Sequence, residues 1–451
     1  MSPLTWDDLT GTKVGIFGFG SEGQAALRAC IARGISPVVV DDRDDFPPMT
    51  GIDVKGTERG GLEELMRCDV VIKTPGISRY DVPVAALRAS GVRVVGALAL
   101  WLAGHPHRER VLCITGTKGK STTTHIAGKL LSGLGYRVFV GGNLGTAPFD
   151  PGAHADDADY WVIEVSSYQA ADMEVSPPVV AVTSLHPDHL PWHGGDVETY
   201  YRDKLRLCSR PGAQVTVVNG DSEVVRDHSA QLGPRVTWVT APQPGDPDWG
   251  WIEPMNLLGE HNRRNARIAA TALREMGIPA ADDPVAMAVA ASGFIPLPNR
   301  LQHVGDVDGV DFVDDGLSTN VLPTLAALEA FPDQPVALIV GGLDRGIDYT
   351  ELGRGLRART APVLMLTIPD SGARIAREVT AAAPGPLVEV QQTATLEEAV
   401  RTGFVWVRDQ RLLVSPGRGV VLLSPAAPSF GRYRNYKDRS AAFVEVIGRL
   451  R

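Results

Sequence analysis

A glycine-rich segment in the first third of the chain has the residue types needed to hold phosphate groups. It reads Gly116-Thr117-Lys118-Gly119-Lys120-Ser121-Thr122 and directly follows an apolar strand predicted over 110–115. Backbone N–H groups of such a turn at a helix N-terminus bind phosphate oxygens, a lysine neutralises the β/γ charge, and a serine hydroxyl can reach a magnesium ion. The loop is two residues shorter than the G-x-x-x-x-G-K-[ST] pattern. The segment therefore predicts a site for a nucleoside triphosphate.

Three further polar clusters each follow an apolar run in the same part of the chain. The strands predicted over 137–140, 160–165 and 179–183 lead into Gly141–Gly145, Ser166–Gln169 and Ser184–His189. Because the carboxyl ends of parallel strands meet at one edge of a sheet, we expect these clusters to converge. The second of these strands carries Glu164 close to its end, and a carboxylate beside a phosphate loop is a natural Mg²⁺ ligand.

The third cluster belongs to a dense group of polar residues that could be functional or could form a solvated loop. The group contains His186, His189 and His193, which is a high density of histidine for a chain with ten in total. Histidine is both a metal ligand and a proton carrier near neutral pH, so a binding role is the sharper hypothesis. The residues in question are His186, Asp188, His189 and His193.

A second glycine turn lies near the N-terminus, in the segment Gly18-Phe19-Gly20-Ser21-Glu22-Gly23. It follows a strand predicted over 13–18 and precedes a predicted helix over 24–33, and the next strand, over 36–40, ends at Asp41. This G-x-G-x-x-G spacing with an acidic residue about 20 positions on is typical of NAD or FAD binding. Glycines that serve only close packing are the alternative. A further strand over 68–73 ends in the turn Thr74-Pro75-Gly76, expected at the same sheet edge.

A third region begins near Pro298 and repeats the pattern of buried strands that end in polar residues. Strands are predicted over 309–313, 336–340, 363–366 and 420–423. The first ends in Asp314 and Asp315, and the last leads into Ser424–Phe430. Buried runs that alternate with helical segments predict an α/β fold throughout.

Length, composition and charge set the broad class. A chain of 451 residues suggests about three domains. A net charge of −9 disfavours non-specific nucleic-acid binding. No apolar run reaches the ~18 residues of a membrane span, and the N-terminus lacks the basic and apolar regions of a signal peptide. The four widely spaced cysteines are typical of reduced thiols, so we predict a cytoplasmic protein.

Taken together, the motifs resemble the Mur ligases, and among them the MurD type, over nearly the whole chain. The resemblance implies an enzyme that extends the peptide stem of a nucleotide-linked peptidoglycan precursor, in cell-wall synthesis during growth and division. It implies three domains: a Rossmann-like UDP-sugar domain over 1–105, a P-loop ATP domain over 106–298 and a doubly wound amino-acid domain over 299–451. It also implies a monomer. The residues that carry it are Gly116–Thr122, Gly142–Gly145, Glu164–Gln169, Asp188-His189, Tyr201–Leu205, Gly259–Asn262, Asn265, Asn299-Arg300 and Leu423–Ser429.

The resemblance also implies a reaction and the residues that support it. The carboxylate of UDP-N-acetylmuramoyl-L-alanine attacks the γ-phosphate of ATP, and the amino group of glutamate then displaces phosphate from the acyl phosphate. One Mg²⁺ would be held by Ser121 and Glu164, and a second by His189 with Lys204, a lysine that is usually carbamylated in this family. Lys120 would neutralise phosphate charge and Asn143 would contact the acyl phosphate. The implied ATP-binding residues are Gly116, Thr117, Lys118, Gly119, Lys120, Ser121, Thr122, Asn265, Arg300 and Asp315.

Under this resemblance the N-terminal glycine turn holds a UDP-sugar instead of a nicotinamide cofactor. The UDP-sugar contacts are Gly18, Phe19, Gly20, Ser21, Asp41, Thr74, Pro75 and Gly76, and the remaining substrate contacts are Ser166, Gln169, Thr319, Arg345, Ser429 and Tyr436.

The C-terminal region departs from the usual MurD pattern where glutamate is expected to bind. This chain has Asn299-Arg300 where His-Arg is usual, and Leu317 where a lysine is usual. It has Arg345 in place of the lysine of Gly-Gly-x-x-Lys, and Tyr436 where Phe is usual. Lysine and arginine recognise carboxylates differently, so these changes would redirect amino-acid recognition. We predict a variant subgroup that adds L-glutamate. The alternatives are an ordinary D-glutamate ligase, a non-catalytic binding module of the same fold, and an NAD enzyme.

Overall fold

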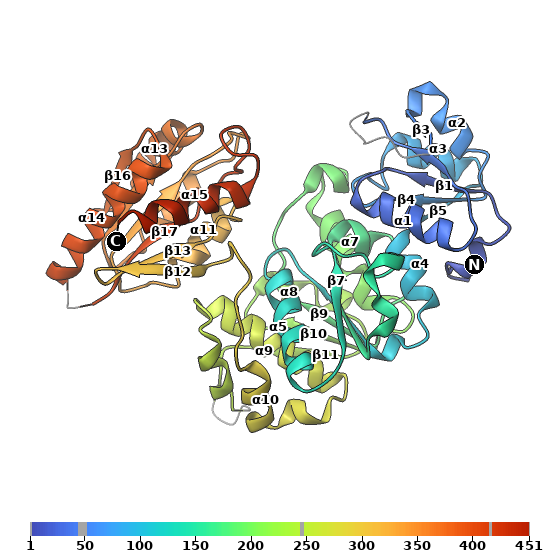
Figure 1. Ribbon diagram of the computed structural model, residues 1–451, viewed down its shortest axis with the longest axis horizontal. Helices are drawn as coiled ribbons and strands as arrows, with labels where there is room; N and C mark the ends of the chain where they lie inside the picture. Colours follow the sequence, from blue (N-terminus) through green and yellow to red (C-terminus); the bar gives the residue numbers. More distant parts are fainter. Residues whose placement is uncertain (1, 44–51, 244–247, 415–416, 451) are drawn as a thin grey trace. The chain divides into compact units, whose positions relative to one another are not determined.

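A computed structural model of the chain describes residues 2–43, 52–243, 248–414 and 417–450. It contains three β-sheets, each flanked by helices (Figure 1). Residue contacts divide the chain into two compact units, Met1–Met255 with Arg264–Phe294, and Asn256–Arg263 with Ile295–Arg451. The predicted α/β class with largely parallel sheets is confirmed. The first unit holds the N-terminal and central sheets, and the second unit holds the third.

The N-terminal sheet is entirely parallel, in the order β3-β2-β1-β4-β5. Because β1 lies between β2 and β4, the strand order reverses at β1, and the turn after it lies where α/β folds bind ligands. Helices α1 and α4 pack on one face, and α2 and α3 on the other. The elements are β1 (Val14–Phe17), α1 (Ser21–Ala32), β2 (Val38–Val40), β3 (Val54–Lys55), α2 (Gly61–Leu65), β4 (Val70–Lys73), α3 (Val82–Ala89), β5 (Arg93–Gly96) and α4 (Ala97–Gly104).

The central sheet has six parallel strands in the order β11-β10-β9-β6-β8-β7. Strands β6, β9 and β10 are buried at every position, as expected for a parallel sheet covered on both faces. The strands are β6 (Val111–Thr115), β7 (Val138–Gly142), β8 (Tyr160–Glu164), β9 (Val179–Val182), β10 (Val215–Asn219) and β11 (Val236–Val239). The helices are α5 (Lys120–Gly133), α6 (Ser167–Ala171), α7 (Val197–Ser209), α8 (Glu223–Asp227), α9 (Glu260–Glu275) and α10 (Pro284–Ala291).

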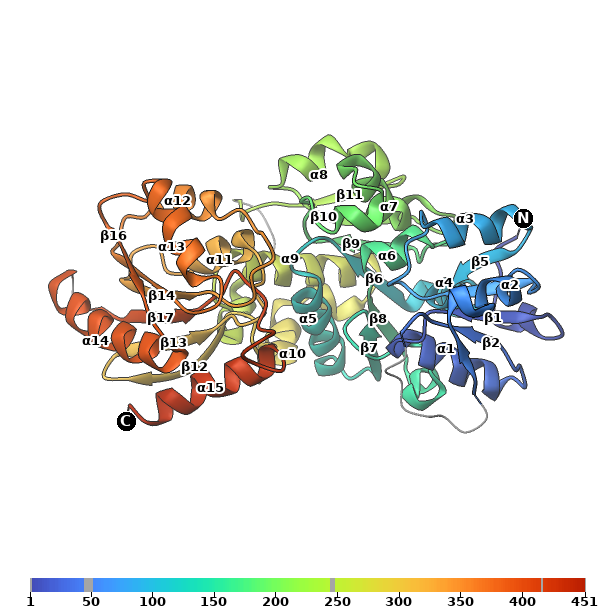
Figure 2. The same cartoon turned by 90° about the horizontal axis from the view of Figure 1, so that it is seen from above.

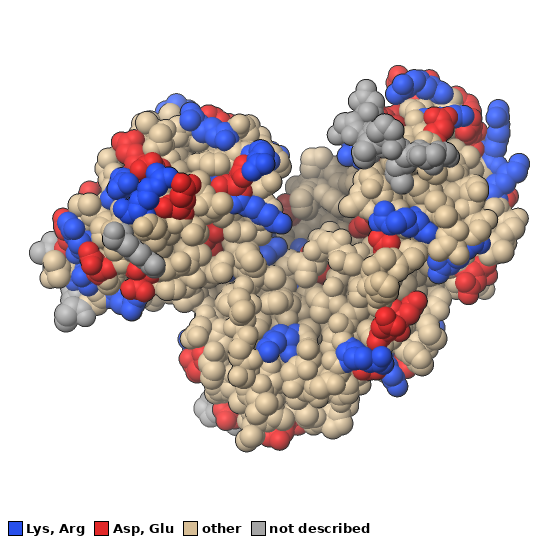
Figure 3. Space-filling view, viewed as in Figure 1, with Lys and Arg blue, Asp and Glu red and all other residues tan. Residues whose placement is uncertain are grey.

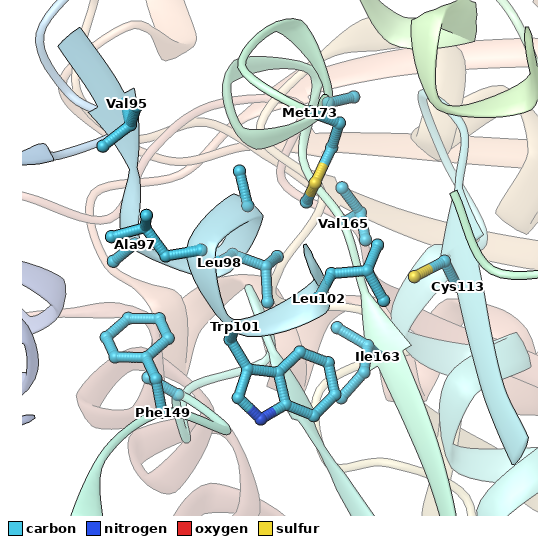
Figure 4. Packing of buried hydrophobic residues seen from close by; sticks show 14 of the residues in the cluster. Val95, Ala97, Leu98, Trp101, Leu102, Cys113, Phe149, Ile163, Val165 and Met173 are labelled. Atoms are coloured by element: carbon cyan, nitrogen blue, oxygen red, sulfur yellow. The ribbon is translucent and has the colours of Figure 1, made fainter. Parts of the chain in front are cut away.

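Helix α4 joins the N-terminal and central sheets through one hydrophobic cluster. Figure 4 shows Leu98, Trp101 and Leu102 of α4 packed among side chains of the central sheet such as Ile163. All of these side chains are at most 8% exposed. The two sheets therefore share a core, which explains why they form one compact unit.

The segment 105–110 follows α4 and is rich in polar residues, but its first residue is buried. The His105 ring lies 4.7 Å from the ring of Trp101 and 4.3 Å from that of Trp161, and only 8% of the residue is exposed. Burial lowers the pKa of His105 to about 4. The residue is part of the core because its uncharged ring fills space between two indoles.

The sheet of the second unit has the order β12-β13-β17-β14-β15-β16, with β12 antiparallel to β13 and all other pairs parallel. Helices α11, α12 and α13 cover one face, and α14 and α15 cover the other (Figure 2). Alternate residues of β14 enter the two cores, so the sheet is doubly wound as predicted. The elements are β12 (Gln302–Val307), β13 (Val310–Asp314), α11 (Val321–Leu328), β14 (Val336–Val340), α12 (Thr350–Leu356), β15 (Val363–Thr367), α13 (Gly372–Ala381), β16 (Val388–Gln392), α14 (Leu396–Val414), β17 (Gly419–Leu423) and α15 (Tyr436–Gly448).

Charged side chains of both signs are found on the surface of the protein. On the face in Figure 3, basic and acidic side chains lie close together in many places. Ion pairs such as Arg374 with Asp344 and Arg28 with Asp150 also join opposite charges in the described part of the chain. Within the described ranges, no helix is long and apolar enough to cross a bilayer.

Candidate active site

The phosphate-type loop runs from the end of β6 to the start of α5, and its geometry requires glycine at two positions. Gly116 has a φ of +137°, and a Cβ atom there would lie 2.1 Å from Thr183 Oγ1. Gly119 has a φ of +89°, and its Cβ would lie 2.8 Å from Asn265 Oδ1. Both contacts are too short for any side chain. The second also places Asn265 of α9 directly against the loop.

The segment after β9 holds this loop from one side. The Lys118 backbone N–H donates to Ser184 Oγ at 2.8 Å, and Lys118 Nζ forms an ion pair with Asp188 at 3.1 Å. The Thr117 hydroxyl donates to the His186 carbonyl at 3.0 Å and shares a hydrogen bond of 2.8 Å with Tyr200. The predicted convergence of the strand-end clusters on the loop is therefore seen for this segment.

Two lysine side chains converge on the same loop carbonyl. Lys120 Nζ donates to the Gly116 carbonyl at 2.9 Å and to the Thr117 carbonyl at 3.0 Å. Lys204 Nζ, from α7, donates to the Gly116 carbonyl at 3.0 Å. Lys204 is only 2% exposed, and burial together with the charge of Lys120 holds its pKa well below the usual value. Two amino groups therefore meet at the Gly116 carbonyl, and Lys120 is placed to bind an anion at the loop.

Asn143 and Glu164 form a second pair at the same sheet edge. Asn143 Nδ2 donates to Glu164 Oε1 at 2.7 Å, and the Asn143 backbone N–H donates to the Glu164 carbonyl at 2.9 Å. Glu164 is 2% exposed, and its second carboxylate oxygen has no hydrogen-bond partner among the described residues. A buried carboxylate oxygen without a donor is costly. The arrangement therefore fits a cation bound at Glu164.

The short helix Leu190–His193 follows β9, and the histidine before it and the histidine that ends it have different environments. The side chain of His189 is 56% exposed, and its ring lies 5.3 Å from that of Tyr168. Partial burial and the nearby lysines lower the pKa of His189. The His193 ring is fully buried between Asp203 at 2.8 Å and Ser167 at 3.1 Å. His189 is therefore accessible to a ligand, whereas His193 is fixed within the fold.

The N-terminal glycine turn combines packing glycines with an open position. A Cβ atom at Gly18 would lie 2.0 Å from Thr74 Oγ1, and one at Gly23 would lie 2.1 Å from the Gly18 carbonyl. At Gly20 the nearest atom would be 3.6 Å away. Close packing therefore explains two glycines of the motif and leaves space beside the third.

The predicted acidic residue after β2 is tied to the same turn. Asp41 accepts the Phe19 backbone N–H at 2.5 Å, and its carboxylate pairs with Arg43 at 3.2 Å. Burial opposes ionisation, but these donors hold the pKa of Asp41 below its usual range. Asp41 thus fixes the backbone of the turn, a structural contribution in addition to its predicted contact with substrate.

A buried polar network links the two sheets of the first unit. Lys73 Nζ at the end of β4 pairs with Asp172 at 2.7 Å, and both side chains are at most 8% exposed. Gln169 donates to Glu22 at 2.7 Å. Ser166 and Gln169 also form the capping box of α6. Ser166 and Gln169, which were predicted to contact substrate, therefore have a structural role. The sequence offers one indication of this network, because Lys73 is a charged residue at the end of a buried strand.

We expect the Glu22→Gln variant to become more stable relative to the wild type as pH rises. Burial raises the pKa of Glu22 to about 7, so its carboxyl keeps a proton in the folded state that the unfolded chain loses above its ordinary pKa of 4.5. The wild type therefore loses stability between these values, and Gln does not. Urea unfolding at pH 5 and pH 8 should show a gain of about 2 kcal/mol for the variant at the higher pH.

The exposed Glu63→Gln on α2 is the matched control for this measurement. Its stability relative to the wild type should be the same at both pH values. An equal effect of Glu22→Gln at pH 5 and pH 8 would contradict the assignment.

In the second unit, Asp315 organises the loops at the carboxyl edge of the sheet. Its carboxylate accepts the Leu301 backbone N–H at 3.1 Å, the Ser424 hydroxyl at 2.8 Å and the Ser318 hydroxyl. Burial raises the pKa of Asp315 to about 7. The neighbouring Arg300 is half-buried. Because Asp315 is occupied by these internal donors, any contact with ATP comes in addition to a structural role.

The sequence reading missed Arg439, which is the largest fully buried side chain of the chain's described part. Its guanidinium donates to the Gly316 carbonyl at 3.0 Å, the Gly341 carbonyl at 3.2 Å and the Ala427 carbonyl at 3.2 Å. It thus ties together the three loops that carry the predicted glutamate contacts. Of those contacts, Thr319 and Arg345 are exposed, Tyr436 is half-buried and Ser429 is buried.

Comparison with known proteins assigns the chain to a family. The Mur ligase middle domain matches residues 114–245. A UDP-N-acetylmuramoyl-L-alanine--L-glutamate ligase from a Micromonospora species is 38% identical over 463 residues, covering 98% of this chain and 97% of the relative. A protein of the same name from Salinispora tropica is also 38% identical, with 98% of both chains covered. The chain belongs to the Mur ligase family.

A solved structure supports the fold. The MurF ligase from Thermotoga maritima in complex with ADP aligns with 99% of this chain and 98% of its own, with a TM-score of 0.55 and 15% sequence identity. The full-length relatives are named as ligases, which rules against the NAD enzyme that the first glycine turn alone suggested.

Proposed function

We propose that the chain is an ATP-dependent ligase that joins glutamate to UDP-N-acetylmuramoyl-L-alanine in peptidoglycan precursor synthesis. The observation that carries the proposal is full-length similarity to ligases named for this reaction, combined with a loop that brings Lys120 and Lys204 to one carbonyl. We further propose that it acts as a monomer in the cytoplasm. Its four cysteines are free and buried, in keeping with a reducing compartment.

The reaction proceeds through an acyl phosphate. A substrate carboxylate oxygen attacks the γ-phosphorus of ATP, the bond to the bridging oxygen breaks and ADP leaves. The amine of glutamate then attacks the acyl carbon, the carbon–oxygen bond to phosphate breaks, and the amine loses a proton as the amide forms. The protein contributes positions and charges for both transfers. Lys120 stabilises negative charge on the phosphoryl group in transfer, and Asn143 orients the acyl phosphate.

The residues around Glu164 fit Mg²⁺. Ser121 and Glu164 would hold one ion, and His189 with Lys204 would hold a second. The described residues contain no cluster of three His, Cys, Asp or Glu side chains that could bind a metal, so phosphate oxygens would complete the coordination. Bound Mg²⁺ neutralises phosphate charge. The unpartnered oxygen of Glu164 supports this assignment.

We also propose that Lys204 is carbamylated. Burial and the charge of Lys120 lower the pKa of Lys204, against the opposing effect of the Asp188 and Glu164 carboxylates. A lowered pKa favours the neutral amine, which is the form that adds to CO₂ with loss of a proton. The product is an anionic carbamate. A carbamate oxygen is a suitable ligand for Mg²⁺, whereas an ammonium would repel the ion.

The amino acid proposed is L-glutamate. Both relatives reported above are named for the L enantiomer. The loops that Arg439 holds together include Leu317, where a lysine is usual, and Arg345. Loss of one cation and replacement of another by a planar guanidinium change how a carboxylate is held.

A phosphate-release assay tests the ligase reaction. Purified protein with ATP and Mg²⁺ should release phosphate only when UDP-N-acetylmuramoyl-L-alanine and glutamate are both present, with a product heavier than the acceptor by one glutamyl residue. Phosphate release with no such product would refute the proposed reaction, and binding of the UDP-sugar without any turnover would favour a non-catalytic module.

A further inference from the structure

The turn proposed to bind the UDP-sugar is held from behind by two side chains. Trp192 Nε1 donates to the Pro75 carbonyl at 2.9 Å, and Lys73 Nζ donates to the Ile77 carbonyl at 3.0 Å. Gly76, between these carbonyls, is exposed, and a Cβ atom there would meet nothing within 4 Å. The turn is therefore fixed on one side and open on the other.

The indole that holds the turn belongs to the short helix that begins directly after His189. The Trp192 backbone N–H donates to the His189 carbonyl at 3.1 Å. The indole also stacks on the ring of Tyr168, with centroids 4.6 Å apart and an angle of 26° between planes. The ring of Tyr168 also contacts the ring of His189, with centroids 5.3 Å apart. Backbone and side-chain contacts thus connect the turn to His189.

The indole itself is firmly supported. The Lys73 ammonium lies 5.4 Å from the centroid of the Trp192 ring, within the range of a cation–π contact. That ammonium is held by Asp172 at 2.7 Å and is fully buried. Because the indole is held in place, a displacement of the turn moves the side chains packed against the indole as well.

We propose that Trp192 is a positioning residue that couples binding at the Thr74–Gly76 turn to the placement of His189. The inference rests on the proposed function, which gives the turn to the UDP-sugar and His189 to the phosphate-transfer site. When substrate occupies the turn, the hydrogen bond from the indole to the Pro75 carbonyl fixes the position of the indole. The indole then fixes Tyr168, and Tyr168 fixes the ring of His189. The same contacts act in reverse, since coupling between two sites is reciprocal.

The Trp192→Phe variant tests the first half of this coupling. It removes the N–H donor and keeps an aromatic ring for Tyr168. Calorimetry without ATP should show a Kd for UDP-N-acetylmuramoyl-L-alanine raised about fivefold to tenfold, the effect of losing one hydrogen bond. The KM for ATP should stay within about twofold. Trp161→Phe is the matched control, because the Trp161 indole donates to the Ala155 carbonyl at 2.8 Å within the core. The Kd of this variant for UDP-N-acetylmuramoyl-L-alanine should be unchanged.

Substitution of Tyr168 tests the second half. Tyr168→Ala removes the ring that contacts both Trp192 and His189, so kcat should fall about tenfold while the Kd for the UDP-sugar stays within about twofold. Tyr168→Phe keeps the ring and should restore kcat. A purely structural role would instead lower the melting temperature and the active fraction in all of these variants without separating Kd from kcat.

A wild-type Kd for Trp192→Phe would overturn the inference, as would a Tyr168→Ala variant with wild-type kcat. These outcomes are distinct from failure of the proposed function. A wild-type protein that binds the UDP-sugar and forms no product with either glutamate would refute the ligase reaction, and the Kd comparison would still test Trp192.

Discussion

Replacement of Lys120 by alanine is expected to lower kcat by about 10³-fold or more, with little change in the melting temperature. The Lys120 ammonium lies over the phosphate-type loop, bonded to the carbonyls of Gly116 and Thr117. In phosphoryl transfer the protein contributes mainly charge stabilisation, and loss of one preorganised charge typically costs 10²- to 10⁵-fold. Phosphate release under saturating ATP, UDP-N-acetylmuramoyl-L-alanine and glutamate measures the effect.

Lys129→Ala is the matched control for this experiment. Lys129 lies on the same helix, nine residues further along, which places it about 13 Å from Lys120 along the helix axis. It should retain kcat within about twofold. Unchanged turnover in Lys120→Ala would show that the loop does not serve ATP.

Replacement of Lys204 by arginine is expected to lower kcat by at least about 10²-fold while the protein stays folded. Arginine keeps a positive charge and cannot form the carbamate, so it presents a cation where an anionic oxygen is required. The buried position, bonded to the Gly116 carbonyl at 3.0 Å, leaves little room for another arrangement. Steady-state kinetics with varied Mg²⁺ measures the loss.

Carbonate dependence separates carbamylation from a simple effect of size. Wild-type activity should fall in buffer purged of CO₂ and return when bicarbonate is added, whereas the arginine variant should respond to neither. Full activity of Lys204→Arg, or wild-type activity that is insensitive to CO₂, would contradict carbamylation. Lys129→Arg provides a lysine-to-arginine change outside the site.

The phosphate-type loop could be predicted from sequence because its chemistry is local. Gly116, Gly119 and Lys120 lie within five residues; the backbone of the turn requires the two glycines, and the Lys120 side chain bonds to the same turn. Glu164 was found because it closes a buried strand in the same sheet. The strand-end clusters converge because parallel strands present their carboxyl ends at one edge.

Other contacts were missed because they join residues that are far apart in the chain and have no local pattern. The Trp192 contact with Pro75 spans 117 residues, and the Arg439 contact with Gly316 spans 123. His105 stands in a polar segment, and nothing local shows that the distant Trp161 packs against its ring. Edge strands such as β12 are partly exposed and lack a continuous apolar run, so the sequence did not reveal them.

The roles of the glycines also needed the structure. The spacing of the first glycine turn indicates a nucleotide site, yet Gly18 and Gly23 are explained by close approach of Thr74 and of the turn's own backbone. A shared fold can carry different ligands, so the proposal that this turn binds a UDP-sugar and not a nicotinamide cofactor rests on the remainder of the chain and on the names of its relatives.

The most direct test of the central claim is the ratio of kcat/KM for L-glutamate to that for D-glutamate, measured with ATP, Mg²⁺ and UDP-N-acetylmuramoyl-L-alanine, followed by chiral analysis of the hydrolysed product. The account predicts that L-glutamate is preferred by at least about tenfold, equivalent to about 1.4 kcal/mol of transition-state discrimination, and that the product contains L-glutamate. Faster incorporation of D-glutamate would contradict it.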